Sequence, residues 1–267
     1  MHSSLSRPAL PCLAAVFLTL CLFAGCTTSP DGALQGDAVM GTERDSVLAL
    51  LAALDSQTFT DAFDALPRYT YARQTRTEQR RSDSSLVAAY EQDVRFQNQG
   101  DRRTRTVTAA DSSGAFEQGL FGFFASSDSS RTDPPSVAPY MVPDDPAYLS
   151  PRNQEDFTYH RLPDTTIGQA QALVVEVRAR PSSSQNLRRL RLAVDPETRL
   201  PLAIHLERAD QSLLYREQSV FDLEMQATAS GDRLPHRTRV QANLKRFFRP
   251  TQRFTTTSTY SGFEEME

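Results

Sequence analysis

The strongest pattern in the sequence lies between residues 167 and 208, where three stretches alternate apolar and polar side chains. A β-strand directs successive side chains to opposite faces of its sheet, so each stretch predicts a strand with one apolar and one polar face. The apolar positions are Leu173, Val175, Val177 and Ala179, then Leu190, Leu192 and Val194, then Leu202, Ile204 and Leu206. This apolar face must be covered by a helix, a lipid or a partner.

Similar β-type segments lie on both sides of this region. Residues rich in Tyr, Val, Thr and Phe occupy 69–79, 85–97, 102–110, 157–162, 213–225, 234–248 and 253–263. Short turn-rich breaks separate neighbouring segments, which favours antiparallel pairing. Strands do not alternate with long helices, so a parallel α/β sheet is not expected. The fold class predicted is α+β with a large antiparallel sheet.

One helical region is expected, over residues 42–66. Thr42 or Asp45 can cap its start, and Pro67 ends it. Its apolar positions recur at helical spacing: Val47, Leu48, Leu51, Leu54, Phe59, Phe63 and Leu66. Such a stripe on an amphipathic helix normally packs against a core. We therefore expect this helix to cover part of the sheet.

Residues 111–156 are expected to interrupt the sheet, because Ser, Asp and Pro dominate them. The segment also contains the densest aromatic cluster of the chain: Leu120, Phe121, Phe123 and Phe124. Two interpretations are open. The aromatic side chains fill the concavity of the sheet, or they form an exposed loop that contacts a membrane or a partner protein.

The first 25 residues resemble a lipoprotein signal peptide. Arg7 precedes an apolar stretch from Ala9 to Gly25, and Cys26 follows directly. Leu22 to Cys26 (LFAGC) resembles the bacterial lipoprotein box, which implies that Cys26 is acylated after cleavage. The alternatives are a transmembrane anchor or a simple secretion signal. Acyl chains on one cysteine would anchor a soluble domain to a membrane, and palmitate is one candidate chain.

The other cysteines and the residue after Cys26 add to the expected processing and location of the protein. Cys12 and Cys21 lie in the segment to be removed, so no internal disulfide is expected in the mature chain. Thr27 stands where lipoproteins retained at the inner membrane often carry aspartate. The resemblance therefore implies the periplasmic face of the outer membrane. Residues 26–41 are expected to be a flexible tether, and 42–267 a single domain with the insert 111–156.

Composition excludes some classes of function. The chain carries 29 basic and 33 acidic residues, and the arginines are scattered, so nucleic-acid binding is not expected. Motifs of hydrolases, metalloproteases and nucleotide-binding enzymes are missing from the sequence, and we expect no enzyme, cofactor or metal. His160, His205 and His236 lie on three separate predicted strands, and we expect them at the surface.

Taken together, the chain resembles the lipoprotein-sorting superfamily, whose members have a LolA/LolB-like half-barrel. The closest match is the hairpin LRRLRLAVDPETRLPLAIHLER, in which Asp195, Thr198, Leu200 and Pro201 match the turn. Arg199 stands where the superfamily commonly has glycine, so a positive φ there would strain the backbone. The resemblance implies a curved antiparallel sheet of about nine to eleven strands, an incomplete barrel covered by helices and enclosing an apolar cavity.

Two functions follow as hypotheses. In the first, the half-barrel of a membrane-anchored periplasmic lipoprotein binds an apolar ligand, an acyl chain or a lipoprotein. In the second, the cavity is filled by the protein itself, and the lipoprotein acts by surface contacts in a structural or regulatory role. The candidate cavity lining is Leu173, Val175, Val177, Leu190, Leu192, Val194, Leu202, Ile204 and Leu206. An open cavity at these positions favours the first hypothesis.

Overall fold

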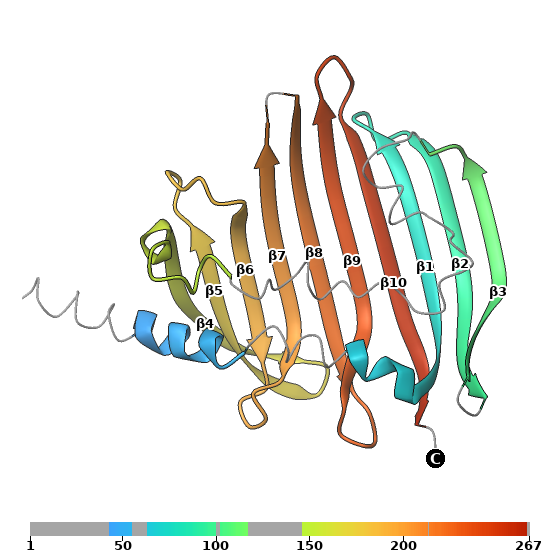
Figure 1. The fold of residues 1–267 in the computed structure, drawn as a ribbon, viewed down its shortest axis with the longest axis horizontal. Helices are drawn as coiled ribbons and strands as arrows, with labels where there is room; N and C mark the ends of the chain where they lie inside the picture. Colours follow the sequence, from blue (N-terminus) through green and yellow to red (C-terminus); the bar gives the residue numbers. More distant parts are fainter. Residues whose placement is uncertain (1–42, 55–62, 100–101, 117–145, 213, 266–267) are drawn as a thin grey trace, which may run out of the picture. The chain divides into compact units, whose positions relative to one another are not determined.

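The structure of the chain is a computed structural model, which describes residues 43–54, 63–99, 102–116, 146–212 and 214–265. Ten antiparallel strands form one sheet (Figure 1). The strands are β1 (Tyr69–Arg81), β2 (Leu86–Gln99), β3 (Arg102–Gly114), β4 (Phe157–Ile167), β5 (Ala170–Ala179), β6 (Leu187–Val194), β7 (Pro201–Gln211), β8 (Tyr215–Ala227), β9 (Arg233–Arg246) and β10 (Gln252–Glu265). The short 3₁₀ helices are η1 (Leu66–Arg68) and η2 (Gln154–Asp156). The predicted fold class, a curved and unclosed antiparallel sheet, is confirmed.

The sheet is a meander joined to a three-stranded unit. Its strand order is β3-β2-β1-β10-β9-β8-β7-β6-β5-β4, so β4 to β10 follow one another in space as they do in sequence. The last strand then pairs with the first, in a register that runs from Tyr69 opposite Glu265 to Arg81 opposite Gln252. The edges of the sheet are β3 and β4, and no strand pairing closes it between them. All the described residues lie in a compact unit, Val39–Glu267, which contains the whole described core.

One face of the sheet carries the main hydrophobic core. The helix over residues 43–52 buries Val47 and Leu51 against it, as the helical spacing predicts. Leu66 of η1 and Tyr148 join the same core from other parts of the chain. We call this side the helix-side face and the opposite side the outer face. Residues 55–62, including Phe59, lie outside the described residues.

The helix also protects an edge of the sheet. The backbone N–H of Arg161 in β4 donates a hydrogen bond to Oε1 of Glu43 at 2.9 Å. Arg44 donates a hydrogen bond to Oε1 of Gln154 at 3.1 Å, and its guanidinium lies 5.7 Å from the ring centroid of Tyr159. An edge strand with free backbone groups can pair with another chain, and these contacts occupy part of that edge.

The predicted boundary of the insert differs from the observed one. β3 continues to Gly114, so the segment from Asp111 pairs with β2 instead of leaving the sheet. Its side chains are exposed on both faces, and alternation therefore gives no signal there. β4 begins at Phe157. The aromatic cluster Leu120, Phe121, Phe123 and Phe124 lies outside the described residues.

Candidate ligand-binding site

Most of the predicted cavity-lining residues are packed inside the core of the helix-side face. Their exposed fractions are at most 5%: Val175, Val177, Leu190, Leu192, Val194, Ile204 and Leu206. The same core contains Val47, Leu51 and Leu54 from the helical segment. The centre of the predicted concavity is therefore filled by the protein's own side chains. Leu173 is only partly buried and lies at its margin.

Leu202 is the exception among these residues. It belongs to a second cluster with Ala172, Val174 and Ala193, not to the main core. A register shift between β6 and β7 pairs Ala193 with Ala203 and Val194 with Pro201, so Leu202 falls out of the alternation. The expected position of Leu202 on the main apolar face is thus wrong.

An open pocket remains beside the helix, and we call it the helix-side pocket. Its volume is about 490 Å³, and it is lined by Ser46, Val47, Ala49, Leu50, Ala53, Arg161, Leu173, Val175 and Arg199. Small side chains at Ser46, Ala49 and Ala53 leave room between the helix and β5. Of the predicted lining set, Leu173 and Val175 line this pocket. A pocket of this size can hold a small ligand.

Two arginines belong to the lining of the helix-side pocket. Arg161 projects from the edge strand β4 and also pairs with Asp164 at 3.2 Å on the surface. Arg199 comes from the turn between β6 and β7, where Oδ1 of Asp195 accepts backbone hydrogen bonds from Glu197 at 2.9 Å and Thr198 at 3.1 Å. These backbone hydrogen bonds hold the pKa of Asp195 below its usual value.

The backbone of Arg199 has φ = 60°, which meets the condition under which strain was expected at this position. An L side chain in this left-handed region costs of order 1 kcal/mol relative to glycine. We expect Arg199→Gly to raise the free energy of unfolding by about 1 kcal/mol, measured by urea denaturation. Arg199→Ala is the control, because it removes the guanidinium but keeps the strain. Equal gains in both variants would contradict this explanation.

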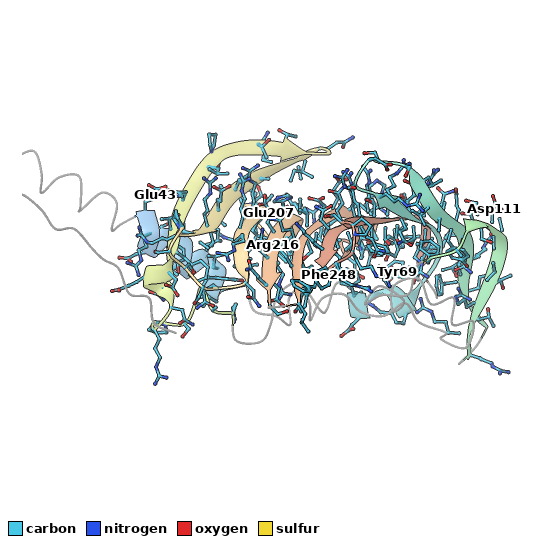
Figure 2. All side chains as sticks on the ribbon, turned by 90° about the horizontal axis from the view of Figure 1, so that it is seen from above. Glu43, Tyr69, Asp111, Glu207, Arg216 and Phe248 are labelled. Atoms are coloured by element: carbon cyan, nitrogen blue, oxygen red, sulfur yellow. The ribbon has the colours of Figure 1, made fainter. Side chains whose placement is uncertain are left out.

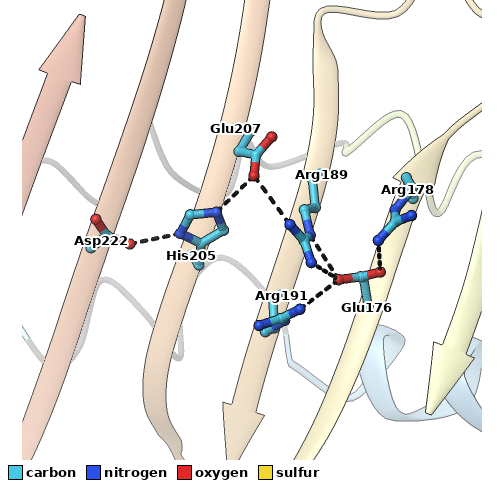
Figure 3. A network of polar contacts seen from close by, with 7 residues as sticks. All are labelled: Glu176, Arg178, Arg189, Arg191, His205, Glu207 and Asp222. Carbon is cyan, nitrogen blue, oxygen red and sulfur yellow. Dashed lines mark hydrogen bonds and ion pairs between the residues drawn. The ribbon is translucent and has the colours of Figure 1, made fainter. Parts of the chain in front are cut away.

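The outer face carries a network of charged residues across β5 to β8 (Figure 3). Its centre is Glu176, which has an exposed side-chain fraction of only 3%. Its carboxylate pairs with Arg178 at 2.7 Å, Arg189 at 2.7 Å and Arg191 at 3.1 Å. Burial alone would raise the pKa of Glu176, but the arginine hydrogen bonds and charges outweigh it and lower the pKa.

The network continues through His205, which the sequence placed on the polar face. Nδ1 of His205 lies 2.7 Å from Oδ1 of Asp222, and Nε2 lies 3.0 Å from Oε1 of Glu207. Glu207 in turn contacts Arg189 at 3.4 Å. Burial would lower the pKa of His205, but the two carboxylates outweigh it and raise the pKa above 6.5. His205 is therefore a structural link between strands and not an isolated surface residue.

A second pocket, of about 440 Å³, lies on the outer face. The β4–β5 hairpin bends over this face, away from the helix (Figure 2), and buries Val174 and Ala193 with Leu162 and Ile167. Charged residues from β6 to β9 line the other side of the pocket: Arg191, His205, Asp222, Glu224, Arg237 and Arg239.

Within the described ranges, no cluster of His, Cys, Asp and Glu has the arrangement of a metal site. Over the same ranges, no helix is both long and apolar enough to span a bilayer.

Comparisons with known proteins show only distant similarity. No family model matches the sequence, and no curated protein does either. Among solved structures, a LolA superfamily protein from Nitrosomonas europaea is 12% identical, covering 80% of this chain and 94% of that chain with a TM-score of 0.26. A DUF1329 family protein from Desulfovibrio piger is 10% identical, with coverages of 79% and 91% and a TM-score of 0.29. A domain described as outer membrane lipoprotein-sorting, from Vibrio parahaemolyticus, is 9% identical, with coverages of 84% and 93% and a TM-score of 0.30.

Proposed function

We propose that this protein is a periplasmic lipoprotein that binds an apolar ligand in the helix-side pocket. The observation that carries the proposal is the pocket itself, which is open beside Leu173, although most of the predicted lining residues are buried in the core. Leu173 and Leu50, which are only partly buried, offer apolar surface to a ligand, and burying such surface favours binding.

The lining also indicates which end of a ligand lies at the surface. Arg161 and Arg199 are the charged residues of an otherwise mostly apolar lining. Arginine binds carboxylate and phosphate groups through paired hydrogen bonds. The ligand that this arrangement fits best is an acyl chain with an anionic end, such as a fatty acid or the acyl part of a lipid.

A specific observation supports a second function. Leu190, Leu192 and Ile204 are each 2% exposed, so the protein fills the centre of its own half-barrel. A lipoprotein of this kind can act by surface contacts in a structural or regulatory role, without any bound ligand. The two functions differ in whether the helix-side pocket is occupied.

Filling the pocket separates these two functions. We expect Ala49→Phe to weaken binding of a fluorescent fatty acid by at least about tenfold, because the ring occupies space used by the acyl chain. Ala52→Phe is the matched control, since Ala52 is exposed on the same helix but does not line the pocket. Affinities are measured by titration, with circular dichroism confirming that both variants fold.

Two results would contradict the ligand-binding proposal. One is the absence of measurable binding by the wild-type protein together with the absence of co-purified lipid in native mass spectrometry. The other is an equal loss of affinity in Ala49→Phe and Ala52→Phe, because the probe would then bind elsewhere. The first result would favour the structural or regulatory function.

The proposal includes attachment to a membrane through Cys26. The LFAGC sequence supports acylation, and Thr27 supports the periplasmic face of the outer membrane. We expect Cys26→Ser to lose incorporation of labelled palmitate in cells, because the thiol is the site of attachment. Labelling that persists in this variant would contradict the assignment. Cys12→Ser is the matched control, since Cys12 lies in the segment to be removed.

A further inference from the structure

The turn before β8 and the turn after β9 lie at the same end of the sheet (Figure 1), and both carry exposed apolar side chains. Leu214 precedes β8 and is 70% exposed, while Phe247 and Phe248 follow β9 and are 62% and 92% exposed. The backbone N–H of Phe247 donates a hydrogen bond to the carbonyl of Leu214 at 2.9 Å, so the two turns are in contact. We call these three residues the apolar tip.

The conformation of the tip keeps its rings in solvent. The two phenylalanine rings lie 4.2 Å apart, centroid to centroid. Phe248 has φ = 60°, which is costly for a bulky side chain. The N–H of Arg249 closes the turn on the carbonyl of Arg246 at 3.2 Å. Neither burial in the core nor backbone preference explains an aromatic residue here, and strain of this kind is often found at functional positions.

Cations surround the apolar tip although the chain as a whole is acidic, with a net charge of -4. Exposed basic side chains flank it on three strands and a turn: Arg216, Lys245, Arg249 and Arg253. Lys245 is the only lysine of the chain. Arg216 and Arg253 donate hydrogen bonds to Gln211 and Asn243, which are neutral. Within the described ranges, none of these four cations forms an ion pair with a carboxylate.

We propose that the apolar tip inserts into the interface of an anionic bilayer, with the surrounding cations on the lipid headgroups. Aromatic and leucine side chains bordered by Lys and Arg are the combination that binds such interfaces. A second copy of this chain fits less well, because two identical basic rims would repel each other. The tip is separate from the helix-side pocket, and the inference does not rest on ligand binding there.

The apolar tip and the surrounding cations should contribute differently to the affinity for a bilayer. Burying a phenylalanine side chain raises the partition coefficient from water into the membrane by about tenfold or more. Each cation near an anionic surface contributes about fivefold, and salt screens this contribution. Phe247 and Phe248 should therefore dominate the affinity, while Lys245 and Arg249 should determine the preference for anionic lipid.

A tryptophan reporter tests the proposal directly, because the chain contains no tryptophan. The protein used is residues 39–267, the compact unit that holds the whole described core and lacks Cys26. We expect Phe248→Trp emission to shift to shorter wavelength with vesicles of phosphatidylglycerol and phosphatidylcholine, and much less with phosphatidylcholine alone. Val107→Trp is the matched reporter, since Val107 is 42% exposed on β3 and should show no shift.

Vesicle sedimentation gives the quantitative measurement. We expect the double variant Phe247→Ser, Phe248→Ser to bind anionic vesicles at least about tenfold more weakly, with an unchanged thermal unfolding midpoint. The pocket variant Ala49→Phe should bind vesicles like the wild type, which keeps this test independent of the proposed ligand. Equal shifts for the two tryptophan reporters, or wild-type vesicle binding by the double variant, would overturn the proposal. Tip-dependent dimerisation without vesicle binding would overturn it as well.

Discussion

Replacing Phe96 with alanine is expected to lower the free energy of unfolding by about 3–5 kcal/mol, the usual range for a large aromatic side chain in a core. Phe96 in β2 is completely buried, with 0% exposure. It stacks on Tyr71 of β1 at 4.7 Å, and the two residues are direct cross-strand partners. The guanidinium groups of Arg73 and Arg103 lie 5.4 Å and 5.3 Å from its ring centroid. Alanine would remove all of these contacts and leave a cavity.

The cost should be large because Phe96 belongs to a cluster of aromatic side chains that spans three strands. Tyr71 contacts Tyr260 and Phe263 of β10 at ring distances of 6.1 Å and 5.6 Å, so the aromatic side chains hold β1, β2 and β10 together. Burial raises the pKa of Tyr71 to about 12, so its hydroxyl stays neutral in the core. Loss of Phe96 would also expose this hydroxyl to water.

Urea denaturation followed by circular dichroism measures the effect of Phe96→Ala. Phe247→Ala is the matched control, because the same side chain is removed from a position that is 62% exposed. We expect the control to change the free energy of unfolding by less than about 0.5 kcal/mol. Similar losses in the two variants would show that the aromatic cluster is not a major source of stability.

Replacing Glu176 with glutamine is expected to lower the free energy of unfolding by about 2 kcal/mol at neutral pH. The carboxylate is 3% exposed and bridges three arginines on β5 and β6. Loss of one partner of a fully buried ion pair costs about 3–5 kcal/mol, but water solvates these arginines, whose side chains are 26–55% exposed, and reduces the cost. Glutamine keeps the shape of the side chain but removes its charge.

The pH dependence of this effect follows from the lowered pKa of Glu176. A carboxylate whose pKa is lower in the folded state stabilises the protein fully above its unfolded value, near 4.5. This contribution is lost as the pH falls through the folded pKa. The difference between the wild type and Glu176→Gln should therefore be constant above about pH 5 and shrink at lower pH.

Urea midpoints at a series of pH values measure both parts of the Glu176 effect. Glu91→Gln is the control, because the Glu91 side chain is 44% exposed and 3.8 Å from Arg76. Its replacement should cost less than about 0.5 kcal/mol at any pH. A difference for Glu176→Gln that grows toward low pH would show that the carboxylate is destabilising in the fold.

Several features of the fold were predictable from the sequence because their causes are local. Alternation identified strands such as 170–179 and 201–211, since a strand shows its two faces at every second residue. Helical spacing identified the helix that buries Val47 and Leu51. The turn at Arg199 has the positive φ expected from its match to a glycine position. The sequence also predicts acylation of Cys26 and attachment to a membrane. Cys26 lies outside the described residues.

Other features depend on contacts between residues far apart in the sequence, and only the tertiary structure decided them. The pairing of β1 with β10 brings the first and the last strand of the chain together in the interior of the sheet. The bent β4–β5 hairpin buries Val174 and Ala193 in a second cluster, apart from the main core. Whether the apolar face is filled or open depends on where the helix packs, and among the described residues this packing leaves the helix-side pocket open beside Leu173. Local patterns specify which face of a strand is apolar, but packing between distant segments determines what covers that face.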